Sequence, residues 1–320
     1  MIYWRKAMKA NKSFRIFAWI VLGWNLVVIL WGAYVRATGS GAGCGAHWPL
    51  CNGEILPQAP EVKTLVEFIH RLSSGMALIL VILLAGWAWR SYRRGHAARL
   101  GAGLALLFIV FEALIGAGLV LFSLTAENTS LQRVIAIALH LLNTFLLLAA
   151  LALTAWWAHD GERPNLRRQP ALAWALGAGF GLALLVGMSG AVTALGDTLF
   201  PAASLAEGLS QDVDPAAHFA VRLRIWHPVL AVISAFYLGF AGGLTALFSA
   251  RRRVKRLGLG LILLLGIQLT AGLVNLLLLA PVWMQIVHLL LADLVWIVLV
   301  LFAAEVFRPG QLSEAIPYAN

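Results

Sequence analysis

Long apolar stretches separated by short polar clusters run through the whole chain. A helix needs roughly 20 mainly apolar residues to cross a hydrocarbon layer about 30 Å thick. Eight stretches are long enough, and none alternates apolar with polar residues as the strands of a membrane β-barrel do. They cover residues 14–35, 65–89, 100–122, 132–157, 171–194, 218–249, 257–280 and 283–304. The pattern predicts an all-α integral membrane protein with eight transmembrane helices in a lipid bilayer.

Composition supports this fold class and excludes several others. Hydrophobic residues make up 61% of the 320 residues and charged residues only 12%, about half the share of roughly 25% in soluble domains. A secreted disulfide scaffold, a disordered chain and a soluble nucleic-acid-binding protein are excluded, so we expect no nucleic-acid partner. The first apolar stretch follows a basic cluster and lacks a small-residue cleavage site, and we expect a retained helix instead of a signal peptide.

Basic residues predict how the helices are oriented in the membrane. Eighteen of the 24 Lys and Arg residues lie in the N-terminal segment, in the second, fourth and sixth connections, or in the C-terminal tail. Because loops rich in Lys and Arg stay in the cytoplasm, we expect both termini to be cytoplasmic. The first connection, which contains Cys44 and Cys51, is then expected outside. The net charge of +10 reflects these membrane anchors and not a surface for nucleic acids.

Short segments recur along the chain and indicate an internal duplication. Val35–Gly39 is similar to Val192–Gly196, 157 positions later, and His140 is matched by His288, 148 positions later. Two halves of four helices each follow from this match. They comprise residues 1–160 and 161–320. Since each half has an even number of spans, both enter the membrane from the same side. We therefore predict two tandem four-helix bundles, related by a pseudo-two-fold axis along the membrane normal.

Four of the eight histidines lie in the even-numbered spans, one in each, within the first turns from the outer side. They are His70, His140, His227 and His288. Ionisable groups at this depth are costly and usually functional, although hydrogen-bonded packing histidines are the alternative. Imidazole is a good axial ligand of haem iron, whereas no carboxylate or thiolate is placed to complete a tetrahedral zinc site at each pair. We predict two haem sites, with one histidine pair in each half.

Two acidic residues near these histidines are candidates for chemistry. Glu67 precedes His70 by three residues and shares its helix face. The segment Thr64–Glu67 also matches a capping box, which would make the acid a helix cap, and the residue pattern leaves both interpretations open. Glu112 lies in the middle of the third span without an evident partner, as a candidate for a proton path or a polar contact.

Outer-side arginines and the two cysteines complete the set of candidate residues. Arg71, Arg222 and Arg224 would lie near the outer membrane face, where they could bind haem propionates or extend to the interface. Cys44 and Cys51 lie in the first outer loop, where a disulfide persists. Closing so short a loop is worth about 2–3 kcal/mol in the chain-entropy model. The spacing does not separate a structural disulfide from a redox-active pair.

With these residues assembled, the chain resembles the haem A synthase family over essentially its whole length. The most specific segments are Gly32–Gly41, Cys44–Gly53 and Glu67–Arg71. The resemblance implies an oxidoreductase that converts haem O to haem A for terminal oxidases, by oxidising a porphyrin methyl group to a formyl group. It also implies a location in a bacterial-type plasma membrane.

The resemblance further assigns roles to the candidate residues. It places a haem b cofactor in the C-terminal half and the haem O substrate in the N-terminal half. The implied iron ligands are His227 and His288 for haem b, and His70 and His140 for haem O. Glu67 matches an acid important for catalysis. Cys44 and Cys51 match an outer-loop pair, whereas the second pair that some relatives carry is absent from this chain. The implied partners are haem O synthase and an electron-transfer protein. The resemblance does not decide whether the protein forms a homo-oligomer.

Other functions fit some of these residues. A non-catalytic di-haem membrane cytochrome for electron transfer would explain the four histidines, but not Glu67 or a difference between the halves. A transporter without metal would make the histidines packing or proton-relay groups. A prenyltransferase that forms haem O is disfavoured, because the chain lacks the Asp-rich motifs that bind magnesium diphosphate.

Overall fold

The computed structural model describes residues 2–160 and 163–309, and these residues are mostly helical. The long helices are α1 (Ile2–Ala37), α2 (Val62–Ser91), α3 (Ala97–Leu121), α4 (Leu131–Asp160), α5 (Pro170–Leu199), α8 (Trp226–Phe248), α9 (Arg252–Leu277) and α10 (Val282–Val306). The short ones are α6 (Leu205–Val213), α7 (Phe219–Arg222) and a 3₁₀ turn at Leu166–Arg168. Within the described ranges the extended backbone pairs only at an isolated bridge between Cys51 and Glu54.

Eight helical segments in the described part of the chain are long and apolar enough to cross a membrane, which confirms the predicted spans. They are Lys12–Ala37, Val62–Ser91, Ala97–Leu121, Leu131–Ala158, Pro170–Leu199, Phe219–Phe248, Arg252–Leu277 and Val282–Val306. Each predicted stretch falls on one of these segments, with ends that differ by a few residues. Hydropathy finds the apolar centre of a helix, whereas polar residues at the ends continue the same hydrogen-bonded turns. The protein is therefore a multi-pass membrane protein.

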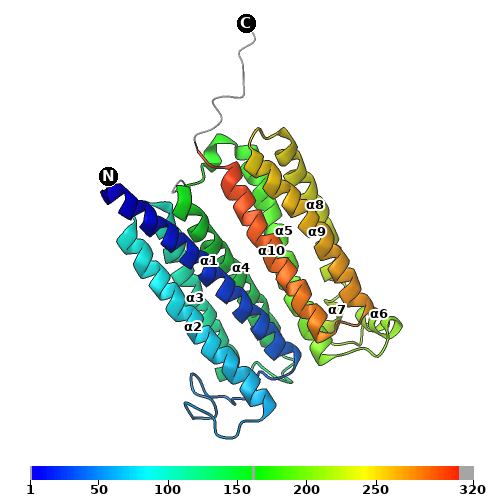
Figure 1. Ribbon diagram of the computed structural model, residues 1–320. Coiled ribbons are helices and arrows are strands. Elements are labelled where there is room, and N and C mark those ends of the chain that lie inside the picture. The colour runs from blue at the N-terminus through cyan, green and yellow to red at the C-terminus, as the bar shows by residue number, and fades with distance from the viewer. Residues whose placement is uncertain (1, 161–162, 310–320) are drawn as a thin grey trace.

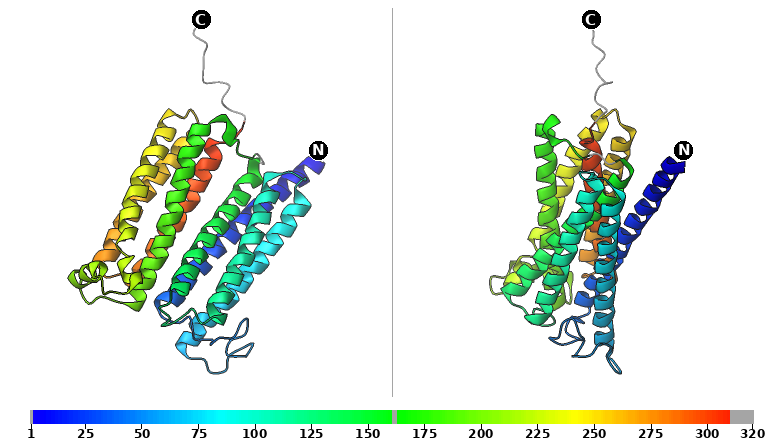
Figure 2. Two further views of the ribbon diagram at one scale, coloured as in Figure 1. Left: turned by 180° about the vertical axis from the view of Figure 1, so that it is seen from behind. Right: turned by 90° about the vertical axis from the view of Figure 1, so that its left-hand side faces the viewer.

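The long helices form two groups that lie side by side (Figures 1 and 2). In the N-terminal group α1 contacts α2 and α4, and α3 contacts α2 and α4. In the C-terminal group α8 contacts α5 and α9, and α10 contacts α9 and α5. Helices α1 and α4 face α5 and α10 across the boundary between the groups. The pseudo-two-fold axis and the division at residues 160 and 161 stay predictions, and residues 161–162 lie outside the described residues.

Close packing joins the two groups, and one buried apolar cluster includes residues from both. The indole Nε1 of Trp296 donates to the carbonyl of Phe145 at 2.6 Å, and the two rings are stacked with centroids 5.1 Å apart. Phe180 meets Trp296 edge-on at 5.4 Å. A Cβ on Gly187 would lie 2.6 Å from the Phe145 ring, so only glycine lets α5 approach α4 this closely. Between membrane helices such tight van der Waals packing takes the place of the hydrophobic effect.

The connections sort to opposite ends of the molecule. The start of α1 and the end of α10 lie at one end, together with the connections that carry the basic clusters (Figure 1). The connection from α1 to α2, which holds Cys44 and Cys51, lies at the other end, as do α6 and α7. This arrangement agrees with the predicted alternation of the loops. Which end faces the cytoplasm stays a prediction.

Candidate functional site

The four predicted histidines lie on four different helices, near the end of the molecule that carries the disulfide loop. His70 is on α2, His140 on α4, His227 on α8 and His288 on α10. Each falls within the first turns of a helix that starts at this end, so the four rings lie at a similar depth. All four residues are partly buried. The structure thus brings them into one layer, as a pair in each helix group.

Glycines on the neighbouring helices make room for three of the imidazole rings. A Cβ would lie 2.9 Å from His70 Cε1 at Gly32, 2.9 Å from His227 Cε1 at Gly190, and 3.0 Å from His288 Cε1 at Gly272. Real Cβ atoms are essentially never found as close as 2.9 Å to another atom and rarely as close as 3.0 Å, so larger residues would displace the rings of His70 and His227 and crowd that of His288. Helices α1, α5 and α9 therefore approach the histidines closely only because these positions are glycine.

The ring geometry of the C-terminal pair suits a shared metal atom. The centroids of His227 and His288 are 6.3 Å apart, and the ring planes are inclined by 88°. With imidazole–metal bonds of about 2 Å, two rings on opposite sides of one iron would have centroids roughly 6 Å apart. The His227–His288 pair therefore fits a bis-histidine haem site, and no cluster of three or more metal-binding side chains is found among the described residues.

The second ring nitrogens have different partners at the four positions. Nδ1 of His227 lies 3.1 Å from the hydroxyl of Ser189. Nδ1 of His140 faces Glu112, whose Oε1 is 3.5 Å away. Nδ1 of His70, of His140 and of His288 is buried without a hydrogen-bond partner among the described residues, so Glu112 lies near His140 Nδ1 but makes no hydrogen bond to it. Each helix group therefore holds one histidine with a polar side chain beside Nδ1, neutral in one group and acidic in the other.

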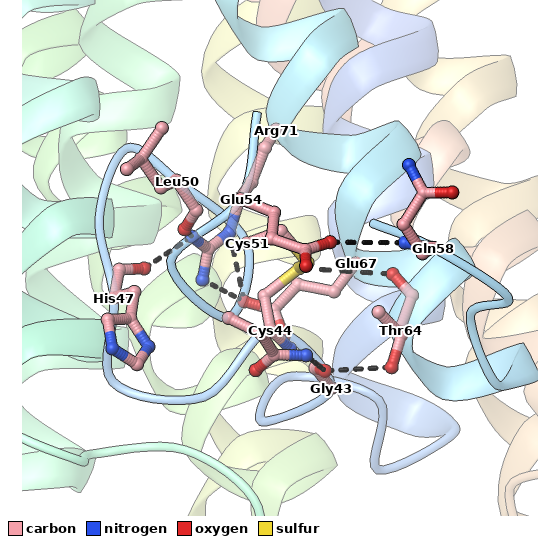
Figure 3. Close-up of a disulfide and its surroundings, with 11 residues drawn as sticks. Gly43, Cys44, His47, Leu50, Cys51, Glu54, Gln58, Thr64, Glu67 and Arg71 are labelled. Atoms are coloured by element: carbon pink, nitrogen blue, oxygen red, sulfur yellow. Dashed lines mark hydrogen bonds and ion pairs between the residues drawn. A yellow bond between two sulfur atoms is a disulfide. The ribbon is translucent and has the colours of Figure 1, made fainter. Parts of the chain in front are cut away.

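Glu67 is not a helix cap, and the capping-box interpretation is wrong. Helix α2 begins at Val62 with Glu61 as its N-cap, one turn before Glu67. Thr64 donates its hydroxyl to the carbonyl of Gly43 at 2.8 Å and not to its own helix. Glu67 instead reaches the disulfide loop, where Oε2 accepts from the backbone N–H of Cys44 at 2.8 Å (Figure 3). Its side chain is only 5% exposed, so a buried carboxylate sits one turn from His70.

Arg71 completes the connection between α2 and the first outer loop. Its guanidinium binds Glu67 Oε1, with Nη2 at 2.5 Å and Nε at 3.1 Å. Nη1 donates to the carbonyls of His47 at 2.5 Å and Leu50 at 2.6 Å (Figure 3). Both of these Arg71 nitrogens donate to the same oxygen while Oε2 is bonded to Cys44 N–H, so both carboxylate oxygens are held. The predicted propionate contact of Arg71 would therefore compete with three partners inside the protein.

The predicted disulfide between Cys44 and Cys51 is present and buried. The two Cα atoms are 4.4 Å apart, and the residues are 0% and 1% exposed. Glu67 and Arg71 both bond to this loop, so the disulfide, the acid and the start of α2 form one connected unit. Whether the pair is structural or redox-active stays open.

The other two arginine candidates differ from each other in their surroundings. Arg224 is buried, with Nε 2.8 Å from Asp212 Oδ1 and Nη1 3.1 Å from Asp197 Oδ1. Nη2 of Arg224 also donates to Gln211 at 3.2 Å. Arg222 is exposed on α7. A propionate contact is therefore open to Arg222 at the surface, whereas at Arg224 it would disturb a buried ionic cluster.

Two polar arrangements were not predicted. Glu112 has partners after all, because Asn143 and Thr144 of α4 both bond to its carboxylate. Both follow His140 by about one turn, so the polar sequence there was a usable signal. Arg36 reaches from α1 to the C-terminal group, where it donates to the Ala194 carbonyl at 2.6 Å and, at 2.8 Å each, to Thr198 and Gln285. Contacts over such sequence distances leave no local pattern.

Comparison with known proteins places this site in a family context. The family model described as "Cytochrome oxidase assembly protein" matches residues 15–300. A Thermus thermophilus protein named "Protoheme IX farnesyltransferase" is 55% identical over 294 residues, which cover 92% of this chain and 48% of that protein. A Halalkalibacterium halodurans protein named "Heme A synthase" is 38% identical over 155 residues, 48% of this chain and 49% of that protein. A Bacillus mycoides protein with the same name is 47% identical over 97 residues, 30% of this chain and 31% of that protein. The chain thus spans about half the length, or less, of these curated relatives.

Proposed function

The chain belongs to the haem A synthase family of cytochrome oxidase assembly proteins, and from this premise we propose that it oxidises a methyl group of haem O to the formyl group of haem A. The observation that carries the proposal is the layer of four histidines on α2, α4, α8 and α10. Glycines on neighbouring helices make room for three of the rings, and the 6.3 Å spacing of one pair fits a bis-histidine haem. The proposed enzyme is an oxidoreductase of a bacterial-type plasma membrane.

In this proposal the two helix groups have different tasks. His227 and His288 hold a haem b, and His70 and His140 hold the haem O substrate. A bound haem b would pass electrons between the substrate site and an external redox partner. Arg36, which joins α1 to α5 and α10 through three hydrogen bonds, fixes the relative position of the two groups. This support keeps the two sites at a constant separation.

Glu67 supplies the negative charge at the substrate side. Oxidation of a methyl group develops positive charge at that carbon, and a fixed carboxylate in a site of low dielectric stabilises such charge. Cys44 N–H and Arg71 hold the two carboxylate oxygens in place, so the charge needs little rearrangement during the reaction. The same contacts hold the disulfide loop in place, and the loop shields the reacting region from the outer solution.

The proposal also covers the surroundings of the enzyme. The basic connections would face the cytoplasm and the disulfide loop would lie outside, according to the positive-inside rule. Haem O synthase would supply the substrate, and an electron-transfer protein would exchange electrons with the haem b. Association of several copies is compatible with the exposed apolar helix faces.

A second candidate function comes from the name of the Thermus thermophilus relative. A protohaem farnesyltransferase would need carboxylates that bind magnesium diphosphate. In this chain Asp197 and Asp212 both pair with Arg224, which leaves them poorly suited to a metal. The name also describes a protein of which about half lies outside the match. Oxidation of haem O is therefore the better supported function.

The proposal is tested by producing the protein in cells that make haem O and analysing the extracted haems. We expect haem A to form, and the purified protein to carry haem b together with haem O or haem A. Two identical, tightly held haems without haem A would instead indicate an electron-transfer cytochrome. A colourless protein would indicate a transporter, and farnesylation of protohaem in cells without haem O synthase would indicate the transferase.

A further inference from the structure

Glu112 is an acidic side chain held inside an apolar helix bundle by contacts from a single neighbouring helix. Its Oε2 accepts from Asn143 Nδ2 at 2.5 Å, and its Oε1 from Thr144 Oγ1 at 2.6 Å. The second proton of the same Asn143 amide goes to the Phe108 carbonyl at 2.9 Å. Both carboxylate oxygens are thus acceptors, and the carboxylate cannot rotate without breaking a bond to α4.

The same carboxylate faces one of the predicted iron ligands. Glu112 Oε1 is 3.5 Å from Nδ1 of His140, an electrostatic contact without a hydrogen bond in this structure, and Thr144 Oγ1 lies 2.9 Å from the His140 carbonyl. The Thr144 hydroxyl has one proton, and the shorter contact to the charged carboxylate takes it. A carboxylate beside Nδ1 favours the tautomer that carries its proton on Nδ1, which leaves the lone pair of Nε2 for a metal.

The matching position in the other helix group is neutral. In the repeat, Gln268 corresponds to Glu112 and His288 to His140. Gln268 Nε2 lies 3.4 Å from Nε2 of His288, so it approaches the nitrogen that would bind iron and not Nδ1. The residues that correspond to the Glu112 partners, Leu291 and Ala292, have no side-chain hydrogen-bonding groups.

The imidazole rings are also turned differently in the two groups. A Cβ on Gly272 would lie 3.0 Å from His288 Cε1, whereas a Cβ on the corresponding Gly116 would meet nothing within 4 Å. His288 therefore lies against the glycine of α9, and His140 lies away from the glycine of α3 and toward Glu112. The acid and the ring orientation change together, which argues that the acid orients the ring.

We propose that Glu112 is a positioning residue for His140, which it holds in the Nδ1–H tautomer as a strongly electron-donating ligand of the haem in the N-terminal group. The proposal rests on the proposed function for the identity of that ligand, but the contact between Glu112 and His140 does not. Carboxylates beside a metal-binding histidine raise its basicity and commonly contribute about 10- to 100-fold to metal affinity. The haem in the N-terminal group should accordingly have a lower reduction potential than it would beside a neutral partner.

The first measurement uses full-length protein without haem. NMR of isotope-labelled histidine reports which ring nitrogen carries the proton, and His140→Ala identifies the signal. We expect the Nδ1–H form in the native protein. In Glu112→Gln, the amide oxygen will face Asn143 and the amide nitrogen His140, so the proton should move to Nε2. A tautomer that is the same in both proteins would overturn the proposal, whatever the protein does with haem.

The second measurement uses the haem-loaded protein. Glu112→Gln should raise the reduction potential of one haem, change its iron–histidine vibration and weaken its binding about 10- to 100-fold, while the other haem is unaffected. Gln268→Glu, as the matched variant, should affect only the other haem. Equal shifts at both haems, or none with both haems retained, would contradict the proposal. A wild-type protein that shows the expected tautomer but binds no haem would refute the proposed function and leave the contact to Glu112 intact.

Discussion

The N-terminal and C-terminal helix groups hold their histidine pairs beside matched ionic residues of opposite sign. Glu67, a buried acid one turn before His70, corresponds in the repeat to Arg224, one turn before His227. Each ionic group has partners of the other sign, Arg71 for the acid and two aspartates for Arg224. The difference teaches that the same arrangement of four helices can place a histidine pair either beside a carboxylate or beside a guanidinium. The proposed division of tasks follows this difference in charge.

The outer connections are fastened in different ways in the two groups. In the N-terminal group the buried disulfide joins the loop covalently, and Glu67 and Arg71 bond it to α2. In the C-terminal group no cysteine is present. Arg224 instead forms ion pairs with Asp197 at the end of α5 and with Asp212 on the short helix α6. Both devices fix the start of a helix that carries a histidine.

The proposed difference between the two groups would be contradicted most directly if both histidine pairs bound the same kind of haem. We expect His227→Ala and His288→Ala to abolish binding of haem b, because each removes one of the two side chains that would hold it. His70→Ala and His140→Ala should keep haem b and abolish formation of haem A. Absorption spectra and extracted pigments of the four purified variants measure both effects. Loss of haem b from all four variants alike would contradict different tasks for the two groups.

The charge at Glu67 gives the next largest effect. Glu67→Gln keeps the shape but removes the charge, and we expect turnover to fall about tenfold or more, where each tenfold corresponds to about 1.4 kcal/mol of barrier. Haem b content should stay near that of the wild type. Arg71→Gln is the matched control, since it breaks the ion pair and the loop contacts but retains the acid. An equal loss in both variants would make anchoring of the loop, and not negative charge, the role of Glu67.

Removal of the disulfide sharpens the comparison of the two outer connections. The double variant Cys44→Ser and Cys51→Ser should lower stability by about 2–3 kcal/mol, the chain-entropy value for so short a loop. Thermal unfolding checks this value, and haem A formation should persist because Glu67 and Arg71 still hold the loop. If stability is unchanged and turnover is lost, the pair is redox-active. In intact cells, an impermeant thiol reagent should label Ile55→Cys, an 84% exposed position of the same loop, from outside.

The smallest effect concerns the different orientation of the two rings. Gly272→Ala would push a methyl group to 3.0 Å from His288 Cε1, and we expect a cost of about 1–3 kcal/mol, typical of overpacking. The variant should lose haem b more readily on heating. A Cβ at Gly116 would meet no atom within 4 Å, so Gly116→Ala should behave like the wild type. Similar haem loss in both variants would mean that the two rings are oriented alike.

Much of the fold followed from hydropathy alone. Eight apolar stretches predicted eight helices, because backbone groups in lipid must be hydrogen-bonded within each helix. The four histidines on alternate spans followed from the same reading, since the spans fix the depth of every residue. The disulfide was also predictable, because it joins the only two cysteines, seven positions apart in one loop. These features depend on local sequence and on the thickness of a membrane.

The partners of the polar side chains were decided by the tertiary structure. The segment Thr64–Glu67 reads as a capping box, yet Thr64 and Glu67 bond to the loop before the helix. Glu112 reads as an unpaired acid, yet α4 supplies both of its donors. Sequence by itself determines which groups are buried in an apolar medium and must find partners. Only the packing of the helices determines which partner lies within hydrogen-bonding distance, because that choice depends on ring orientation and on the close approach that glycines allow.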